Sequence, residues 1–423
     1  MTQRISVICD TCTQGILFRI GIGGEAVQLF SVACPQCKQK IGLELLLNKK
    51  PTSFEGMPIK HFQATVQKYI NCSVAKETNQ FIAINLHAEL VYPKELIHEK
   101  LMLPSVTVMT RMAEHAQEKG IINYENLPKT MGTGPIFTSL FDTLSGDAKL
   151  SQDWIIIKKA YQLKETGLDD LSKNELKKYS DISSLPKNGK YMENIVFEFL
   201  WRYISPNHKL YTDIEDEFEK ARKLNDEEMH KLSDYYINEL KNLNIKNYIE
   251  IFDEYFNNFK DFNRILLNNK INLHPEEGSE SIICPIDFDK IKMYYGNAYE
   301  FFTSHIITLV GVNNILNNRQ YDEFASMTFN HYIKSVSKKS KSKPLQNNVV
   351  LKKFTDILES TIRNASHHKW FYVDETNLGM LKYKSGGTGE ERSISYIDYL
   401  YKCNEITMGL AVLFMIEIYL IEY

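Results

Sequence analysis

The chain has 423 residues, of which 43% are hydrophobic and 24% are charged, and its formal net charge is −3. This composition is ordinary for globular proteins, and the length allows two or three domains with sizeable cores. The slightly acidic balance excludes binding of nucleic acid through overall charge, so any such site requires local clustering of basic residues.

The seven cysteines fall into two close pairs near the N-terminus and three isolated residues, Cys72, Cys284 and Cys403. This distribution is typical of a metal site with free thiols in a reducing compartment, not of a disulfide framework. Residues 1–10 lack the basic start, apolar core and small-residue cleavage site of a secretory signal. We therefore expect a cytoplasmic protein.

Residues 1–50 are predicted to form a small β domain around a metal ion. Two C-x2-C pairs are separated by 21 residues, and each pair suits a tight turn that directs two thiolates to one ion. Gly15–Ile22 and Glu25–Ala33 are strand-like, and we expect a hairpin between them to bring the two pairs together. The candidate ligands are Cys9, Cys12, Cys34 and Cys37.

This pattern resembles the zinc-ribbon family over about residues 6–47. Cysteine fills all four positions of a tetrahedral shell, so we expect one structural zinc ion per chain that supplies much of the folding free energy of this module. The alternative is a redox C-x-x-C, for which one pair on a strand-to-helix turn is sufficient. The ribbon's partner stays open: RNA, DNA, protein or the rest of the chain.

Residues 51–280 are predicted to form a helical middle domain without an assigned role. Apolar residues recur at helical spacing in Leu101–Ala116 and Asp153–Leu163. The acidic segment Tyr211–Lys260 has Tyr and Phe at helical intervals. This pattern predicts a solvated helix pair with a packed aromatic face.

Residues 281–423 are predicted to form a helical bundle that contains a β-hairpin. Leu381–Lys384 and Arg392–Tyr396 flank a glycine-rich turn, which is a hairpin signal. Helical patterns cover Ile291–Leu316, Gln320–Val336 and Asn348–Asn364.

A final helix closes the chain. Its apolar part, Met408–Ile421, is too short to span a bilayer and contains Glu417, so it is predicted to be a buried core helix with no membrane contact. The predicted fold class is therefore mainly α, with a small β zinc ribbon, a helical middle region and a C-terminal helical bundle.

The segment Ser360–Trp370 places an arginine, an amide and two histidines at the end of one predicted helix. RNA cleavage by its own 2′-hydroxyl requires a base, an acid and a cation that stabilises the phosphorane. Histidine serves as acid or base near neutral pH, and arginine matches phosphate oxygens with its planar fork. The segment has no carboxylate cluster for a metal. The candidate catalytic residues are Arg363, Asn364, His367 and His368.

Arg363-Asn364 followed by His368 resembles the active motif of the HEPN superfamily, in which a histidine follows the arginine after four to six intervening residues. His367 is one residue too close, but it shares a face with Arg363 if the helix continues. The hairpin and last helix after the motif also look like the family. The resemblance covers about residues 285–423.

The resemblance implies a C-terminal HEPN domain and an endoribonuclease that needs no metal for catalysis. It also implies a homodimer through residues 285–423, with a composite site that uses residues of both subunits. Such proteins often serve in prokaryotic phage defence, in abortive infection or as toxins, which implies a regulatory protein or a phage component as trigger. The RNA substrate and the base-versus-acid roles of the two histidines stay open.

A basic stretch without acidic residues lies between two of the predicted helices; it is a candidate guide for RNA, although a solvated surface loop is the more common meaning of such a run. Its candidate RNA-binding residues are Lys338, Lys339, Lys341 and Lys343. Trp370 and Tyr372 either stack a base or pack in the core. Three other hypotheses stay open: a helix end at which Arg363 and the histidines bind the last carbonyls, a non-catalytic nucleic-acid-binding or dimerisation scaffold, and a component that needs a partner.

Overall fold

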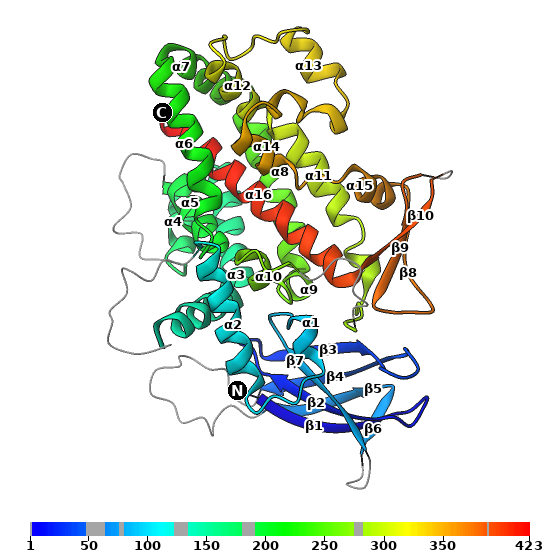
Figure 1. Ribbon diagram of the computed structural model, residues 1–423. Helices are drawn as coiled ribbons and strands as arrows, with labels where there is room; N and C mark the ends of the chain where they lie inside the picture. Colours follow the sequence, from blue (N-terminus) through cyan, green and yellow to red (C-terminus); the bar gives the residue numbers. More distant parts are fainter. Residues whose placement is uncertain are drawn as a thin grey trace. The chain divides into compact units, whose positions relative to one another are not determined.

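The computed structural model shows a mostly helical chain with three small β-sheets and a long C-terminal helix (Figure 1). This agrees with the predicted mainly α class at the level of secondary structure. The structure describes residues 2–47, 64–75, 80–121, 134–179, 191–274, 282–386 and 389–423.

These residues form two compact units, and each unit draws on segments that are far apart in the sequence. Unit 1 comprises Met1–Lys149, Phe259–Lys292 and His368–Asn404. Unit 2 comprises Leu150–Asn258, Met293–His367 and Glu405–Tyr423. Three consecutive domains were expected from the sequence, because composition along the chain does not show which distant segments fold together.

Unit 1 contains two small sheets that hold the cysteine pairs. One sheet has the order β6-β1-β2-β7 and the other β3-β4-β5; β2 and β7 are parallel, and the other pairs are antiparallel. The strands are β1 (Thr2–Cys9), β2 (Gly15–Gly21), β3 (Val27–Ala33), β4 (Lys40–Leu47), β5 (Ala64–Ile70), β6 (Cys72–Val74) and β7 (Phe81–His87). Their inward side chains, including Val7, Phe18, Phe30, Leu43 and Ile84, form one buried core.

Two expectations about this region are wrong. β2 and β3 belong to different sheets, so no hairpin joins the two cysteine pairs; each pair lies in the turn of its own hairpin, β1–β2 or β3–β4. β2 pairs with β1 on one edge and with β7 on the other, and it is buried along nearly its whole length, so side chains on both of its faces are covered. The second error concerns residues 64–74 and 81–87, which were expected within a helical domain but form β5–β7 and complete the two sheets.

Unit 1 also contains the predicted C-terminal hairpin. β9 and β10 pair antiparallel, which confirms this hairpin, and β8 adds a third strand on the other side of β9. Phe288 and Tyr399 pack edge-on against Phe371 in the core beneath this sheet. The elements are α1 (Lys94–Ile97), α2 (Pro104–Glu118), α9 (Phe259–Phe262), α10 (Leu266–Lys270), η4 (Phe288–Lys290), β8 (Phe371–Val373), β9 (Met380–Lys384) and β10 (Glu391–Ser395).

Unit 2 is helical and has an aromatic core in which Trp154 contacts Phe199, Phe252 and Phe256. This core confirms the aromatic face predicted for the acidic middle segment. Its helices are α4 (Asp169–Leu176), α5 (Tyr191–Ile204), α6 (Lys209–Leu224), α7 (Asp226–Tyr235), the π-helix η3 (Tyr236–Leu240), α8 (Lys241–Asn257), α11 (Tyr294–His305), α12 (Ile307–Leu316), α13 (Phe329–Ser335), η5 (Lys338–Ser340), η6 (Lys343–Leu345), α14 (Val349–Thr355) and α15 (Ser360–His367). α3 (Gly134–Glu165) and α16 (Tyr396–Glu422) contribute to both units.

The single helix predicted over Asn348–Asn364 is wrong, because the structure has two helices, α14 and α15, separated by a short break. The Tyr295 hydroxyl of α11 occupies this break: it donates to the Ile357 carbonyl (2.9 Å) and accepts from the Glu359 N–H (2.8 Å). A side chain thus satisfies backbone groups that a continuous helix would have paired internally.

The apolar part of α16 is a buried core segment, as predicted. α16 is long and apolar enough to cross a membrane, yet 89% of its most apolar window is buried. Glu417 is fully buried in it and accepts hydrogen bonds from the Tyr236 hydroxyl (2.9 Å) and the Asn244 amide (3.2 Å), with His305 Nδ1 at 3.3 Å. These partners allow a carboxylate in the core of unit 2. The cytoplasmic location stays a prediction.

Glu89 is a second buried carboxylate, at the end of the β7 segment in unit 1. It is 3% exposed and accepts a hydrogen bond from the Gly24 N–H at 2.6 Å. Gly23 has no room for a side chain, because a Cβ there would lie 2.6 Å from the Glu89 carboxyl carbon. Burial raises the pKa of Glu89 to about 8, so the folded state favours the neutral acid.

We predict that Glu89 makes the protein less stable as pH rises. A carboxyl whose pKa rises from 4.5 to about 8 on folding stabilises the fold fully below pH 4.5, and this contribution is lost as pH rises through about 8. Glu89→Gln should therefore lose less stability than the native protein between pH 5 and pH 8, by on the order of 3–4 kcal/mol. Thermal unfolding at both pH values measures the difference. The exposed Glu95→Gln is the control, and an equal pH response of Glu89→Gln and the native protein would contradict the assignment.

Candidate functional site

The four N-terminal cysteines form one compact thiol cluster in unit 1. The Sγ atoms of Cys9 and Cys37 are 3.7 Å apart, those of Cys12 and Cys34 are 3.6 Å apart, and all four lie within 4.8 Å of one another. Thiolates around a tetrahedral ion at about 2.3 Å from the metal are about 3.8 Å apart. The arrangement is therefore compatible with a structural zinc site. Within the described part of the chain, these cysteines are the one group of three or more potential metal ligands that lie close together.

Both cysteine turns have the same backbone geometry. The residue after the second cysteine donates its N–H to the carbonyl of the first: Thr13 to Cys9 at 2.9 Å and Lys38 to Cys34 at 2.9 Å. Thr13 and Lys38 adopt left-handed conformations, with φ of 58° and 62°. These matched tight turns direct each pair of thiols to the same side of its hairpin.

Asn71, which was not identified from the sequence, ties the two cysteine hairpins together. Its carbonyl accepts from the Asp10 N–H (3.1 Å), and its side-chain amide donates to the Lys40 carbonyl (2.8 Å). Its φ of 50° is left-handed, a conformation that asparagine tolerates better than most residues. The only sequence signal for this role is an asparagine between two strands. Its partners, Asp10 and Lys40, become neighbours only when strands far apart in the sequence pair.

Burial explains the electrostatics of the thiol cluster. Cys9 and Cys34 are fully buried, and burial raises the pKa of Cys34 to about 12. A thiolate at this position therefore requires a compensating cation, which a bound metal ion provides.

The second candidate site lies on α15 of unit 2 and contains three of the four predicted catalytic residues. Arg363, Asn364 and His367 are all part of this helix, and Arg363 and His367 lie one turn apart on one face. His368 follows the end of α15, is exposed, and groups with unit 1. Lys369 has a left-handed φ of 58°, which is typical of the residue that terminates a helix.

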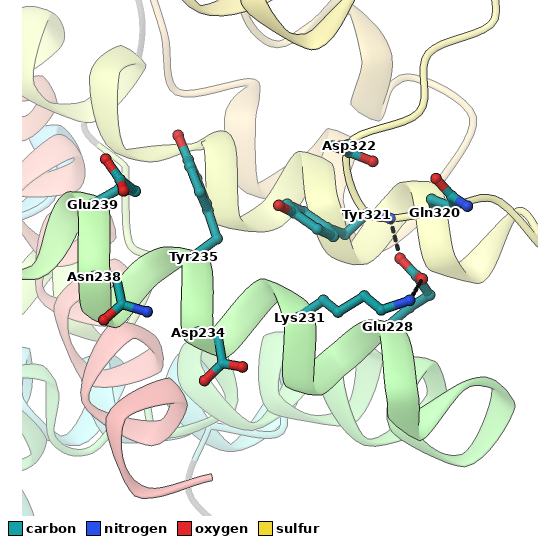
Figure 2. Close-up of a pocket in the computed structure, with 9 residues that line it drawn as sticks. All are labelled: Glu228, Lys231, Asp234, Tyr235, Asn238, Glu239, Gln320, Tyr321 and Asp322. Atoms are coloured by element: carbon teal, nitrogen blue, oxygen red, sulfur yellow. Dashed lines mark hydrogen bonds and ion pairs between the residues drawn. The ribbon is translucent and has the colours of Figure 1, made fainter.

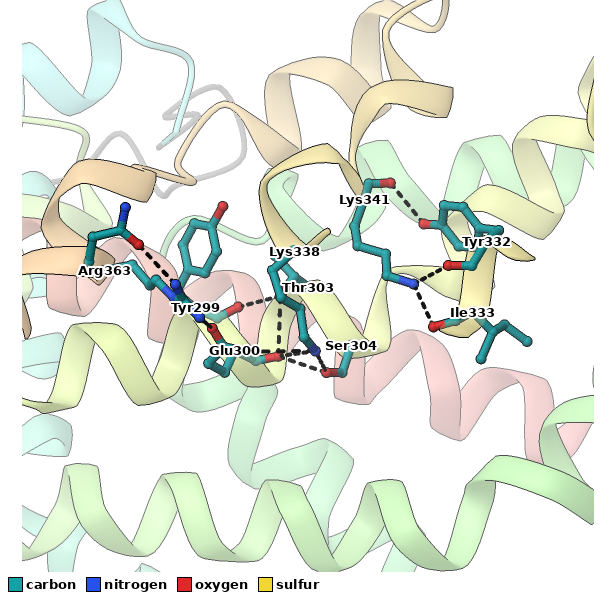
Figure 3. Close-up of polar contacts among 10 residues, drawn as sticks. Tyr299, Glu300, Thr303, Ser304, Tyr332, Ile333, Lys338, Lys341 and Arg363 are labelled. Carbon is teal, nitrogen blue, oxygen red and sulfur yellow. Dashed lines mark hydrogen bonds and ion pairs between the residues drawn. The ribbon is translucent and has the colours of Figure 1, made fainter. Parts of the chain in front are cut away.

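Arg363 is held by two side chains (Figure 3). Its Nε donates to Glu300 Oε1 at 2.6 Å, its Nη2 pairs with the same carboxylate oxygen, and its Nη1 donates to Asn364 Oδ1 at 2.8 Å. The side chains of Arg363 and Glu300 are each 29% exposed. The guanidinium thus binds side chains of α11 and α15 and not the last carbonyls of α15, which argues against a helix-end role for Arg363.

His367 packs tightly against α11. A Cβ at Gly296 would lie 3.1 Å from His367 Nε2 and 3.0 Å from Ser366 Cβ, so the glycine permits the close approach of the two helices. His367 Nε2 is buried and has no hydrogen-bond partner among the described residues. Such an atom is suited to receive a proton or a ligand only if the helices separate locally.

The predicted RNA-binding lysines do not form one exposed patch. The Lys341 ammonium is buried and donates to the Ile333 carbonyl at 3.0 Å and to the Tyr332 carbonyl, where it caps the end of α13. Lys338 is partly buried and contacts Glu300 and Ser304, whereas Lys339 and Lys343 are exposed. This division is not visible in the sequence, because capping depends on where the carbonyls at the end of α13 lie.

Trp370 and Tyr372 lie at the surface of the β8–β9–β10 sheet. They are 40% and 43% exposed, so they are not core residues of the described structure. The Tyr372 hydroxyl donates to Glu391 (2.5 Å), and Lys384 Nζ lies 5.8 Å from the Trp370 ring. Their predicted role in base stacking stays a prediction.

An open pocket of about 460 Å³ in unit 2 has a different character (Figure 2). Glu228 pairs with Lys231 at 2.8 Å and accepts from the Tyr321 N–H at 3.0 Å. The rings of Tyr235 and Tyr321 flank the hollow, 5.8 Å apart. Three further lining carboxylates repel a phosphodiester, so this pocket does not fit RNA. They belong to Asp234, Glu239 and Asp322.

Comparison of this chain with protein-family models, curated proteins and solved structures finds no match.

We predict that Gly296→Ala destabilises unit 2. Alanine normally stabilises a helix interior by about 1 kcal/mol relative to glycine. Here the new methyl would lie 3.0 Å from Ser366 Cβ and 3.1 Å from His367 Nε2, which forces α11 and α15 apart and costs about 1–3 kcal/mol. Thermal unfolding measures the change, with Asn297→Ala as a neighbouring substitution on the same helix. A higher melting temperature for Gly296→Ala would contradict the close contact.

Proposed function

We propose that the protein is an endoribonuclease that needs no metal for catalysis and acts through Arg363, Asn364 and a histidine at the end of α15. The observation that carries this proposal is the arginine: it is held in a fixed orientation on α11 and α15, remains partly exposed, and shares a helix face with His367. The resemblance of this segment and of the elements after it to HEPN ribonucleases supports the same reaction class.

The chemistry follows from the residue types. A histidine removes the proton of the RNA 2′-hydroxyl, the 2′-oxygen attacks the adjacent phosphorus, and the P–O bond to the 5′-oxygen breaks as that oxygen takes a proton from an acid. This leaves a 2′,3′-cyclic phosphate and a free 5′-hydroxyl. Arg363 stabilises the charge on the phosphorane, and Asn364 holds the guanidinium through its Oδ1.

A homodimer through residues 285–423 is part of the proposal. One arginine and one or two histidines per chain are few for a site that needs a base, an acid and a cation. A second copy of the chain supplies a second arginine and further histidines, and movement at the interface between the two copies would also give access to the buried His367 Nε2. A role in phage defence, abortive infection or toxicity, with a protein or phage trigger, follows from the resemblance to HEPN proteins.

The proposed cofactor is one structural zinc ion on Cys9, Cys12, Cys34 and Cys37. The spacing of the four thiols and the matched turns that present them fit zinc, and two complete pairs exceed what a redox motif needs. The ion would join two hairpins of different sheets and so stabilise the core of the β region in unit 1.

A second candidate function is a non-catalytic, nucleic-acid-binding or dimerisation scaffold. The observation in its favour is the same ion pair: the carboxylate of Glu300 already neutralises Arg363, as in a purely structural bridge between α11 and α15. In this case the ribbon carries the binding function, and the chain acts with a partner.

We predict that Arg363→Ala abolishes RNA cleavage. The purified protein is incubated with mixed tRNA and mRNA in excess chelator, with a zinc-reconstituted sample as control for the ribbon. Loss of the cation should reduce the rate at least about 100-fold, and replacement of the catalytic histidine should have a similar effect. His367→Ala and His368→Ala are compared to identify that histidine.

The matched controls are the exposed residues Arg392 and His331, each replaced by alanine. Absence of cleavage by the folded native dimer, or equal cleavage by Arg363→Ala and Arg392→Ala, would favour the scaffold function.

We predict that the purified chain contains one equivalent of zinc and that Cys12→Ser or Cys37→Ser loses it. Both thiols are partly exposed, so a serine there is tolerated sterically, but it replaces a strong ligand by a weak one. Elemental analysis measures the metal, and thermal unfolding measures the accompanying loss of stability. Cys403→Ala, remote in sequence from the cluster, should keep the metal. Full zinc content in both serine variants would rule out the four-thiolate site.

A further inference from the structure

We infer that Glu300 and Lys338 belong to the same phosphate-binding site as Arg363, with Glu300 as the positioning residue of the guanidinium and Lys338 as the second cation. This inference rests on the proposed ribonuclease function and names two residues beyond its motif. It explains why Arg363, which is proposed to bind phosphate, is paired with the Glu300 carboxylate of its own chain.

The three side chains meet at one place on α11 (Figure 3). Glu300 binds Arg363 through Oε1, and its Oε2 lies 3.8 Å from Lys338 Nζ. One carboxylate thus lies between two cations, and the cluster has a net charge of +1. The side chains are 29% (Arg363 and Glu300) and 35% (Lys338) exposed, so solvent and ligands can reach the cluster.

The hydrogen-bond inventory of Arg363 shows that part of it remains available. A guanidinium has five N–H donors, one on Nε and two on each Nη. Glu300 Oε1 accepts from Nε and forms an ion pair with Nη2, which we count as using one Nη2 donor, and Asn364 accepts from Nη1. Among the described residues, one donor on each Nη therefore remains. Two such donors match two oxygens of a phosphodiester.

Glu300 restricts the guanidinium through its Nε side and so leaves the other end for the ligand. An arginine side chain loses considerable rotamer freedom on binding, and a partner that fixes its plane in advance removes this cost. Gly296, one turn earlier on α11, keeps α15 close enough for this contact. Glu300 is therefore suited to orient Arg363 for the transition state more than to bind the substrate.

Lys338 is distinguished from the other three basic residues by its contacts. Its ammonium is anchored by the Glu300 carbonyl (3.4 Å) and the Ser304 hydroxyl, which places a positive charge beside Arg363. The Lys341 ammonium already donates to carbonyls at the end of α13, and Lys339 and Lys343 are exposed to solvent. A phosphate bound to Arg363 would consequently meet Lys338 before any other lysine of this stretch.

The binding test uses a 2′-O-methyl oligoribonucleotide, which cannot be cleaved by attack of its own 2′-hydroxyl. Lys338→Gln replaces the ammonium by a neutral, polar and slightly shorter side chain, and Lys339→Gln is the matched control one residue away. We expect Lys338→Gln to weaken binding about 5- to 10-fold and to reduce the slope of log K against log salt by about 0.7, the value for one phosphate contact on a single strand. For Lys339→Gln, the loss of affinity and the change in salt slope should each be less than half of those for Lys338→Gln.

The positioning test uses Glu300→Gln in the cleavage assay. Glutamine keeps the shape but binds the guanidinium more weakly, so kcat should fall at least 10-fold. RNA binding should be unchanged or tighter, because a negative charge has been removed. A purely structural Glu300 would instead lower the melting temperature, with kcat unchanged in the fraction that stays folded. Because Glu300→Gln removes an ion pair, its folding is checked by thermal unfolding. If the Glu300→Gln variant fails to fold, the binding comparison of Lys338→Gln with Lys339→Gln decides the inference.

The outcomes separate this inference from the proposed function. Loss of cleavage in Arg363→Ala, together with equal binding by Lys338→Gln and Lys339→Gln, overturns the inference and leaves the ribonuclease in place. Absence of any cleavage by the native protein, with a selective binding defect in Lys338→Gln, overturns the catalytic proposal and keeps an anion site. Absence of oligonucleotide binding by the native protein overturns both.

Discussion

The contact between α11 and α15 determines the geometry of the candidate catalytic site. It depends on the missing side chain of Gly296, which lets the ring of His367 approach the α11 backbone. One turn further along each helix, in opposite directions, Glu300 meets Arg363. The two helices therefore meet in a close packing contact at Gly296 and an ionic contact at Glu300, and both contacts fix the same face of α15. The break before α15, satisfied by Tyr295 of α11, fixes where that face begins.

In the cysteine region, a small number of polar contacts likewise fix the geometry of the candidate site. Two hairpins from different sheets present their thiols to one point, and Asn71 links their backbones. The strands around the cluster share one buried apolar core, and the ligand set and the bridging asparagine fix how the two hairpins meet at its edge. Burial of Cys34 adds an electrostatic demand for a cation at the centre of the cluster.

Local pattern predicted those features that depend on neighbouring residues. The two C-x2-C turns, the β9–β10 hairpin and the buried C-terminal helix were predictable, because spacing, turn residues and apolar content are local properties. The parallel pairing of β2 with β7 and the split of the helix before Arg363 were not predictable, because each depends on a partner distant in sequence. The burial of Lys341 was not predictable for another reason: it depends on the chain turning back so that the ammonium reaches the carbonyls at the end of α13, only eight and nine residues earlier. Glu300 was missed for the same reason: nothing near it in the sequence marks it as the partner of an arginine 63 residues later.

The division of the chain into compact units has a consequence for fragments of this protein. The chain passes between the units at 149/150, 258/259, 292/293, 367/368 and 404/405. A cut near residue 280, where the sequence suggests a domain boundary, would remove segments from both units at once. Excised pieces would therefore expose core surface and tend to aggregate, whereas internal nicks in an otherwise complete chain would leave all segments available. Deletion mapping of activity would report misfolding, and point substitutions in the full-length chain are the informative route.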